Sequence, residues 1–482
     1  MDKTESLIFE LSVRGRRATT FPPALQAESI LKEIPSKYIR KEPPALPEVT
    51  EGDVVRHFTR ISQLNFSADT HFYPLGSCTM KYNPRINEKC SALPGFTNLH
   101  PYQDISQIQG MLELFWNLER MLCELTGMSA FSLQPAAGAH GELLGLLVTR
   151  AYFEAKGEKR TKVLVPDSAH GTNPASAALC GYSVVNVPSN KRGRIDKSAL
   201  LAQLGKDVAL VMITCPNTLG LFEDEILEIS KMVHDSGALL YMDGANFNAL
   251  VAQVEPAALG FDMMHLNLHK TFSVPHGGGG PGAGPLGVRK DLEKFLPLPR
   301  VVKEENQFKL LTDSKDSLGQ IRSFYGSTGA LIRAYTYILS LGEDGLKAVS
   351  ENAVLNANYI QSLLKGHYKS YINENCMHEC VISGKDYGNH NVKTLDIAKR
   401  LLDYGFYAPT VYFPLIVPEA MMIEPTETES KKTLEEFVQA MKSIAKEAKE
   451  NPEILKSAPL TTPVRRLDEV TAARFPILRW KK

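Results

Sequence analysis

The stretch ALVMITCPNTLGLFEDEILEISKMVHDSGALLYMD (209–243) decides the fold. It opens with an apolar run at 209–214 and closes with another at 238–243. Each run has the roughly 4–8 residues of a buried strand, and between them the apolar residues over 226–233 recur at helical spacing. A strand, a helix and a second strand in this order join parallel neighbours in a sheet. The stretch therefore predicts a parallel sheet covered by helices.

The same alternation continues on both sides of this unit. VLVP (163–166), SVVNVP (183–188) and the partly apolar FDMMHLNL (261–268) are predicted strands. Apolar residues at helical spacing from Ile108 to Leu125 predict a helix that Gly127 ends. This pattern predicts an α/β fold whose parallel sheet is covered on both faces. Functional residues are expected just beyond the carboxyl ends of the strands.

The segments outside this α/β region have a different character. The first hundred residues are irregular and Pro-rich at FPPALQ (21–26) and KEPPALPEVTEGD (41–53), which predicts an extended arm. A long helix after Leu331, strand-like ECVIS and GFYAPTVYFP, and an amphipathic helix over 431–450 predict a smaller α+β domain. The predicted division is an N-terminal arm (1–100), a large domain (101–330), a small domain (331–450) and a C-terminal tail (451–482).

Composition excludes several classes of function. Lysine plus arginine and aspartate plus glutamate both number 54, so the net charge is zero and neither nucleic acid nor an acidic membrane is an expected partner. The sequence contains no apolar stretch of about 18 residues and no signal-type segment at its start. Its 7 cysteines are few, odd in number and scattered, as in proteins of a reducing compartment. We expect a soluble cytoplasmic protein.

Two charged residues follow predicted strands. Asp243 ends the strand ALLYMD, where a buried carboxylate is costly unless a cation or a ligand's protonated nitrogen meets it. Lys270 follows FDMMHLNL and His269, and a glycine-rich loop, HGGGGPGAG (276–284), comes next. A lysine desolvated in this way readily yields a neutral amine that forms a Schiff base. The alternatives are a helix-capping aspartate and an ordinary surface lysine.

Two further stretches belong to the same pattern. His170 lies in DSAHGTNPAS (167–176) after a predicted strand, where it is either a ring that stacks on a flat cofactor or a solvated loop histidine. The small residues of LQPAAGAHGE (133–142) open a helix, whose N-terminal amides bind phosphate well, although such helix starts are common. A phosphate cradle, a stacking ring, an aspartate and a lysine together favour pyridoxal phosphate as the cofactor.

Seven stretches, spread over nearly the whole chain, carry a clear family resemblance. The chain resembles the pyridoxal-phosphate-carrying subunit of two-subunit glycine decarboxylases, the P-proteins of the glycine cleavage system. This resemblance implies an aspartate-aminotransferase-like (fold type I) large domain with a smaller C-terminal domain. The stretches are FYPLGSCTMKYNP (72–84), LQPAAGAHGE (133–142), DSAHGTNPASA (167–177), TCPNTLGLFE (214–223), YMDGAN (241–246), HLNLHKTFSVPHGGGGPG (265–282) and TTPVRRLDEVTAARFPILRW (461–480).

The resemblance also implies roles for individual residues. Lys270 would hold the cofactor covalently, Asp243 would pair with its pyridine nitrogen, and His170 would stack on its ring. Either His269 or the GSCTMKYNP loop (76–84) would hold the substrate carboxylate. Beyond these three catalytic residues and His269, the implied cofactor-binding residues are Ala137, Gly138, Asn217, Thr218 and Thr328, the last acting across a subunit interface.

The implied reaction is the decarboxylation of glycine by a glycine dehydrogenase of the aminomethyl-transferring kind. Carbon dioxide leaves, and the aminomethyl group passes to the lipoyl arm of the H-protein. The implied partners are that lipoylated H-protein and a sister subunit 1 of similar fold that lacks the lysine. Two copies of each chain would form a heterotetramer.

Four alternatives remain from other classes. A zinc site is disfavoured because His265 and His269 have helical spacing in a predicted strand and loop, and because CMHEC (376–380) lacks a second cysteine pair. A nucleotide-binding loop is disfavoured because GGGGPGAG lacks the GK[ST] ending. A different pyridoxal-phosphate reaction on the same fold and a structural subunit without cofactor are the other two.

Overall fold

The computed structural model describes residues 4–19, 31–42, 44–277 and 282–480. Residues 68–457 form one compact unit, and the termini, residues 1–67 and 458–482, form another. The Pro-rich FPPALQ and the glycines at 278–280 lie outside the described residues. The predictions made for them therefore stay predictions.

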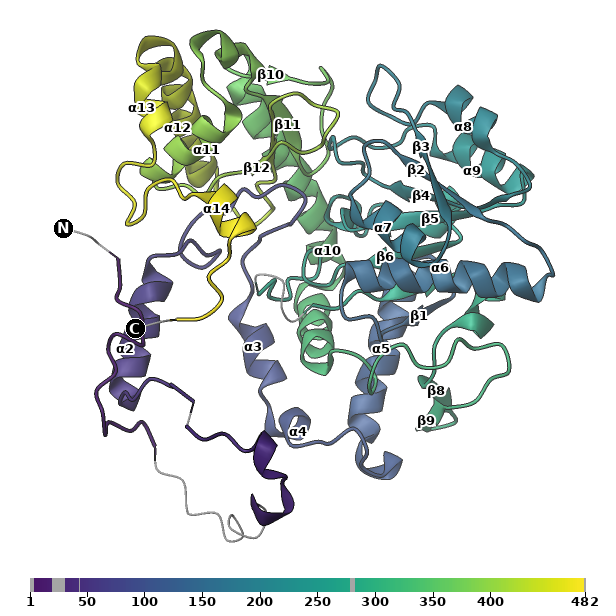
Figure 1. Cartoon of the computed structure of the whole chain (residues 1–482). Coiled ribbons are helices and arrows are strands. Elements are labelled where there is room, and N and C mark those ends of the chain that lie inside the picture. The colour runs from purple at the N-terminus through teal and green to yellow at the C-terminus, as the bar shows by residue number, and fades with distance from the viewer. Residues whose placement is uncertain (1–3, 20–30, 43, 278–281, 481–482) are drawn as a thin grey trace. The chain divides into compact units, whose positions relative to one another are not determined.

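The larger unit is built on a seven-stranded sheet (Figure 1). Its strands are, in sheet order, β1 (Ala130–Ser132), β7 (Leu286–Val288), β6 (Met263–Leu266), β5 (Leu239–Gly244), β4 (Val208–Thr214), β2 (Lys162–Pro166) and β3 (Ser183–Val187). β6, β5, β4, β2 and β3 run parallel, as the sequence predicts. β7 runs antiparallel to both of its neighbours, so the expectation of a purely parallel sheet is wrong at this strand. The chain returns from β6 without a crossover helix, which makes the next strand antiparallel.

The sheet is buried on both faces because helices pack on each side (Figure 1). All seven residues of β4 are buried, and from Leu210 to Ile213 they alternate between two cores. Val211 and Ile213 belong to a core with α5 (Gln109–Thr126), whereas Leu210 and Met212 belong to one with α6 (Gly138–Ala155). This two-sided burial is the reason that the strand reads as an unbroken apolar run. The other covering helices are α7 (Thr172–Leu179), α8 (Lys197–Gln203) and α9 (Ile226–Asp235).

A second, four-stranded sheet lies C-terminal to a long helix, α10 (Thr328–Leu364). The sequence predicts one continuous helix, but α10 is interrupted at Gly342, which has φ 62°. The amphipathic pattern over 431–450 is confirmed by α12 (Lys431–Glu450), which buries Phe437, Met441 and Ile444. The strands are, in sheet order, β10 (Lys369–Ser370), β11 (Cys380–Ser383), β13 (Ala420–Ile423) and β12 (Thr410–Val411).

Shorter elements complete the two units. Within the larger unit these are α3 (Arg85–Ser91), α4 (Pro94–Thr97), α11 (Thr394–Asp403), α13 (Pro452–Ser457) and the hairpin β8 (Arg300–Glu304) with β9 (Gln307–Leu311). The terminal unit contains α2 (Glu51–Gln63), which begins with a capping box at Thr50, and α14 (Glu469–Arg474). The rings of Phe9 and Trp480 stack at 5.1 Å, so the two ends of the chain meet in this unit.

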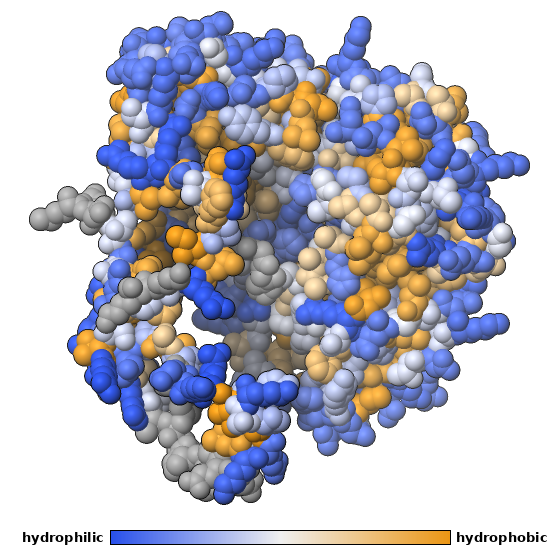
Figure 2. Space-filling model, viewed as in Figure 1, coloured by the Kyte–Doolittle hydropathy of each residue, from blue (hydrophilic) through white to orange (hydrophobic). Residues whose placement is uncertain are grey.

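Hydrophilic side chains cover much of the visible face, with apolar residues in scattered patches between them (Figure 2). No described helix is both long enough and apolar enough to span a membrane.

Candidate active site

Three predicted site residues follow parallel strands that end at one edge of the main sheet. His170 follows β2, Asp243 lies at the end of β5, and Lys270 lies in the turn after β6. The charge of Lys270 contributes to the pKa shifts of both His170 and Asp243, so the three side chains share one site. Lys270 is only 7% exposed, which excludes the surface-lysine alternative.

Asp243 is a fully enclosed carboxylate with several partners. Its Oδ1 accepts a hydrogen bond from the amide of Ala245 at 2.9 Å, and its Oδ2 accepts one from Asn173 Nδ2 at 3.1 Å. His265 Nε2 lies 3.3 Å from Oδ1. Burial opposes ionisation, but the charge of His265 and these hydrogen bonds lower the pKa of Asp243. The residue does not cap a helix, because Asn246 is the N-cap of the short helix η3 (Phe247–Ala249).

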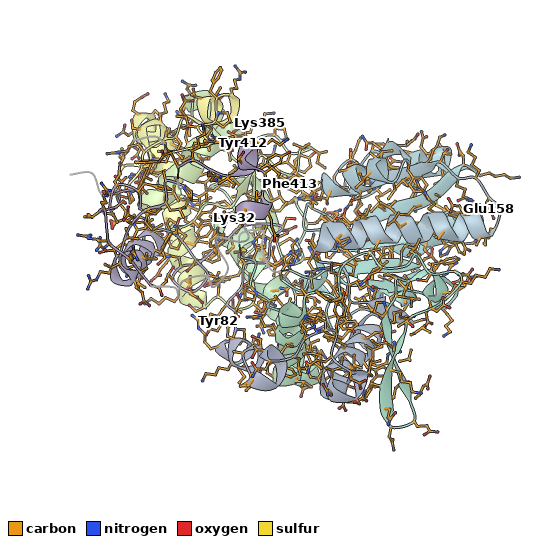
Figure 3. The ribbon with its side chains drawn as sticks, turned by 60° about the horizontal axis from the view of Figure 1, so that its bottom comes forward. Lys32, Tyr82, Glu158, Lys385, Tyr412 and Phe413 are labelled. Carbon is orange, nitrogen blue, oxygen red and sulfur yellow. The ribbon has the colours of Figure 1, made fainter. Side chains whose placement is uncertain are left out.

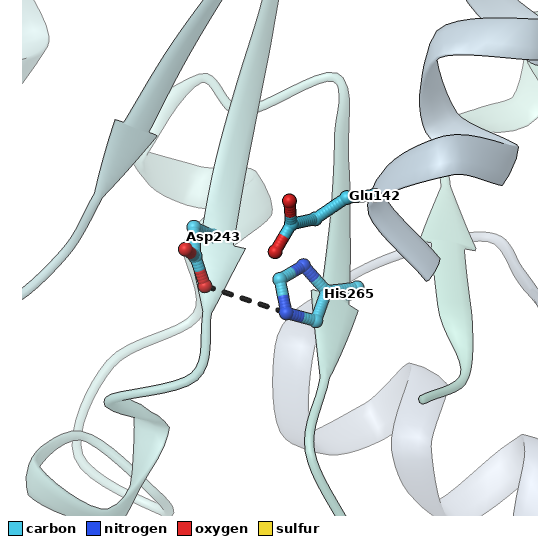
Figure 4. A group of neighbouring side chains, drawn as sticks. All are labelled: Glu142, Asp243 and His265. Carbon is cyan, nitrogen blue, oxygen red and sulfur yellow. Dashed lines mark ion pairs between the residues drawn. The ribbon is translucent and has the colours of Figure 1, made fainter. Parts of the chain in front are cut away.

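Glu142 is a second carboxyl beside Asp243 (Figure 4), and it was not among the residues predicted for the site. It projects from α6 and accepts hydrogen bonds from Thr172 Oγ1 at 2.9 Å and from Ser176 Oγ at 3.3 Å. Burial, and then the negative charge of Asp243, raises the pKa of Glu142 to about 7. At pH values just below 7, Glu142 therefore holds a proton while Asp243 is ionised. An acidic residue in the small-residue start of α6 was the available signal.

His265 completes this buried group (Figure 4). Its Nδ1 lies 2.7 Å from the hydroxyl of Tyr241, so the ring is fixed between that hydroxyl and Asp243. Burial lowers the pKa of His265. The ring of His269 packs edge-on against the ring of His276 at 5.5 Å. Among the described residues, the group of possible metal ligands that contains His265 also contains Glu142 and Asp243 but not His269.

The N-terminus of α6 approaches the Lys270 turn closely. A Cβ atom on Gly138 would lie 2.1 Å from Asn267 Oδ1, and one on Gly284 would lie 2.0 Å from the carbonyl oxygen of Ala137. Glycine is therefore required at position 284, where the clash is with backbone, whereas at position 138 a larger residue would displace the Asn267 side chain. The N-cap residue Ala137 offers no side-chain cap to the first amides of the helix. Such a helix start suits an anionic group, as predicted for the phosphate of the cofactor.

Polar atoms without protein partners lie next to Lys270. Within the described residues, the Thr271 hydroxyl and His269 Nδ1 are buried and lack a hydrogen-bond partner. Burial, and then the charge of Lys270, lowers the pKa of His269 to about 3, so its ring is neutral. Buried polar groups are usually satisfied, so two such groups beside a buried lysine fit a site that receives a polar cofactor or substrate.

His170 lies at the open side of the site. Its Nδ1 accepts a hydrogen bond from the amide of Thr172 at 3.3 Å, and its ring packs edge-on against Phe413 at 5.7 Å. Phe413 is labelled in Figure 3. Partial desolvation of the ring, and then the charge of Lys270, lowers its pKa. The residue stays solvent-exposed, which leaves its ring available to a planar ligand.

The remaining predicted residues have internal partners. Asn217 donates to the carbonyl of Gly193 and to Glu223, and its Oδ1 accepts the amides of Leu219 and Leu221, so its side chain is used within its own loop. The Thr218 hydroxyl donates to the carbonyl of Ser168 at 2.5 Å, which ties that loop to the segment carrying His170. Thr328 is the first residue of α10. These positions stay predictions as cofactor contacts.

Comparison with known proteins agrees with this arrangement. Residues 24–307 match the model of the glycine cleavage system P-protein, and residues 349–459 match the C-terminal domain of glycine dehydrogenase. This chain belongs to the glycine cleavage system P-protein family. The family predicted from the sequence is thereby confirmed.

Relatives of the P-protein family match over their whole length. The chain is 57% identical over 479 residues to the probable glycine dehydrogenase (decarboxylating) subunit 2 of Caldanaerobacter subterraneus subsp. tengcongensis, covering 99% of each chain. It is 58% identical over 472 residues to the protein of the same name from Pelodictyon phaeoclathratiforme, covering 98% of each.

Solved structures confirm the predicted fold of this P-protein family member. An inhibitor-bound glycine decarboxylase (P-protein) of the glycine cleavage system superposes with a TM-score of 0.75 at 21% identity, covering 87% of this chain and 95% of the other. A cysteine desulfurase from Thermococcus onnurineus NA1 reaches 0.61 at 15% identity, covering 78% and 95%. The aspartate-aminotransferase-like (fold type I) architecture is therefore correct.

Proposed function

We propose that this chain is the pyridoxal-phosphate-carrying subunit of a glycine decarboxylase. It removes the carboxyl group of glycine as carbon dioxide and passes the aminomethyl group to the lipoyl arm of the H-protein. The observation that carries the proposal is the buried Lys270 beside the ionised Asp243, at strand ends that face the N-terminus of α6. The names of the full-length relatives, glycine dehydrogenase (decarboxylating) subunit 2, support the substrate.

When bound, pyridoxal phosphate supplies an electron-withdrawing ring that accepts the electron pair released from the substrate. The Lys270 amine attaches it, and the Ala137–Gly138 amides receive its phosphate. Asp243 holds a proton at the ring nitrogen, because a buried carboxylate stabilises a neighbouring positive charge. His170 presents its ring face.

The proton on Glu142 supports the role of Asp243. If Glu142 were also ionised, two buried carboxylates would compete for the proton of the ring nitrogen. Glu142 avoids this competition by staying neutral up to about pH 7. His265, whose Nε2 lies 3.3 Å from Asp243 Oδ1, holds the carboxylate in place.

The glycine carboxylate needs donors beside Lys270. The Thr271 hydroxyl and His269 Nδ1 are free to donate within the described part of the chain. A neutral histidine donates without adding a charge that would stabilise the carboxylate strongly and oppose its loss. His269 therefore remains our candidate for orienting the carboxylate.

The proposed partners are subunit 1 and the lipoylated H-protein. The relatives are named subunit 2, which supports a sister chain. Two copies of each chain are our expectation. In this transfer the S–S bond of the lipoyl group on the H-protein breaks. One sulfur bonds to the aminomethyl carbon, and the other takes up a proton and becomes a thiol. Seven free cysteines support a cytoplasmic location.

Borohydride trapping tests the proposal directly. The purified chain is loaded with pyridoxal phosphate, with and without subunit 1, then reduced and digested for peptide mass spectrometry. We expect the cofactor on Lys270 and release of carbon dioxide from carboxyl-labelled glycine only with lipoylated H-protein. Attachment elsewhere, or none, overturns the catalytic role, and turnover of another amino acid in preference to glycine favours a different reaction on this fold.

A further inference from the structure

A short turn, Gly76–Thr79, connects Lys270 with two buried carboxyl groups. The carbonyl oxygen of Ser77 accepts a hydrogen bond from Lys270 Nζ at 2.5 Å, and the amide of Ser77 donates to Glu379 Oε2 at 2.8 Å. The amide of Thr79 donates to Glu424 Oε2 at 3.0 Å, and the Thr79 hydroxyl donates to the other oxygen of the same carboxyl. The turn is thus held by Glu379 and Glu424 on one side and contacts Lys270 on the other.

The turn adopts a conformation that needs this support. Ser77 has φ 64° and Thr79 has φ 45°, in the left-handed region that L-residues, and β-branched ones above all, rarely occupy. Gly76 lies against β13, where an added Cβ would be 2.3 Å from Met422 Cγ. Strained backbone persists only where surrounding contacts determine it, and here the two carboxyls supply those contacts.

The carboxyl pair cannot be fully ionised. Glu379, Glu424 and His378 are completely buried, and their ligand atoms lie within 4.8 Å of one another. Burial, and then the charge of Glu424, raises the pKa of Glu379 well above its usual value, and burial raises the pKa of Glu424 to about 7. Burial lowers the pKa of His378 to about 3, so this ring cannot neutralise the pair.

The charges that face the pair agree with a single shared proton. Lys270 is a positive group that acts on both carboxyls. Glu427, a further negative group near Glu424, is paired with Lys81 at 2.7 Å. Within the described residues, Glu379 Oε1 is buried and has no hydrogen-bond partner, so no donor stabilises a negative charge on this oxygen. One proton and one negative charge then remain beside the positive Lys270.

We propose that Glu379 and Glu424 are positioning residues, which share one proton and hold the Gly76–Thr79 turn so that the Ser77 carbonyl receives the Lys270 amine. This inference rests on the proposed cofactor-attaching role of Lys270. The amine must be free while the substrate occupies the cofactor, and it must return afterwards. A fixed carbonyl acceptor keeps the free amine in one place, which shortens its search for the reacting carbon.

Cys78 reports on the turn without any cofactor. It lies between Ser77 and Thr79, and the rate of its alkylation by iodoacetamide is measurable by peptide mass spectrometry in the unloaded chain. Glu379→Leu and Glu424→Leu each remove a carboxyl that accepts hydrogen bonds from the turn, so we expect about tenfold faster alkylation of Cys78. Glu379→Gln keeps an acceptor for the Ser77 amide and should restore nearly the original rate.

Two controls distinguish a local change in the turn from general destabilisation of the fold. Cys90 on α3 is also partly exposed, and its alkylation rate should stay unchanged in every variant. Glu119→Gln changes a buried carboxyl that contacts the amide of Phe131 and Arg300, and it should leave Cys78 unaffected. Folded leucine variants with unchanged Cys78 alkylation would overturn the proposal.

The proton is tested by infrared spectroscopy, which also decides the matter if the leucine variants do not fold. We expect a protonated-carboxyl band of the unaltered chain at pH 6 to be lost in both Glu379→Gln and Glu424→Gln. A band unchanged in both, or a metal bound stoichiometrically to these residues, overturns proton sharing.

The effect of the turn on Lys270 is tested separately, by the rate of cofactor attachment. In Glu379→Leu, but not in Glu379→Gln, we expect covalent attachment of pyridoxal phosphate to become about tenfold slower, because the amine loses its fixed acceptor. Unchanged attachment in Glu379→Leu overturns the positioning role. Failure of the unaltered chain to attach the cofactor at all refutes the proposed function instead, while the Cys78 result still reports on the turn.

Discussion

Carboxyl oxygens of Glu142 and Asp243 lie within 4.8 Å of each other, and the pKa values of the two groups shift in opposite directions. The pKa of Glu142 is raised to about 7, whereas that of Asp243 is lowered. Asp243 has the nearby His265 and a backbone amide as partners, but Glu142 has only hydroxyl donors and an amide group. The environment thus divides two like groups into one acid and one anion.

Glu142→Gln should remove a pH dependence of stability. The pKa of Glu142 is higher in the folded chain than its usual value of 4.5, so the free energy of unfolding falls as pH rises from about 4.5 to about 7. In the glutamine variant this loss, about 3 kcal/mol at most, should be absent. Urea unfolding at a series of pH values measures the difference. Parallel profiles of the two proteins would show that Glu142 does not titrate in this range.

Lys270→Ala should abolish covalent attachment of pyridoxal phosphate and lower glycine decarboxylation by at least about 10³-fold, because the attaching amine is lost. Lys446→Ala, at an exposed position on α12, is the matched control and should be fully active. Radiolabelled carbon dioxide release measures both. Substantial activity in Lys270→Ala would assign the chemistry to another residue.

Asp243→Asn should bind pyridoxal phosphate but lower the turnover number by roughly 10²–10⁴-fold, since a neutral amide no longer stabilises a protonated ring nitrogen. The exposed Asp235→Asn on α9 serves as the control. Steady-state kinetics with glycine and lipoylated H-protein distinguish the two variants. A change in the Michaelis constant alone would contradict this role.

Gly138→Ala should weaken cofactor binding and destabilise the chain by about 1–3 kcal/mol, because the new methyl group would overlap Asn267. Gly110→Ala, whose Cβ would meet nothing within 4 Å, should be close to neutral. Thermal unfolding and fluorescence titration with pyridoxal phosphate measure both effects. Equal behaviour of the two variants would show that α6 does not approach the Lys270 turn closely.

Local patterns predicted those parts of the chain in which neighbouring residues determine the outcome. The apolar runs became β4 and β5, and the amphipathic pattern became α12, because strand and helix periodicity follow directly from which side chains are apolar. Parallel strands end at a common edge, so Asp243 and Lys270 were also predicted to share a site. The reversed β7 was not predicted, since nothing local distinguishes a returning strand from a parallel one.

Sequence alone thus specified the α/β architecture and the lysine, aspartate and histidine at its strand ends, since these depend on periodicity and on residue type. Folding in three dimensions decided which carboxyl groups share that site. Glu142, Glu379 and Glu424 come from a helix, a strand boundary and a distant strand end, and no spacing relates them. Their proton affinities arise from burial and from mutual distance, which exist only once the chain is packed.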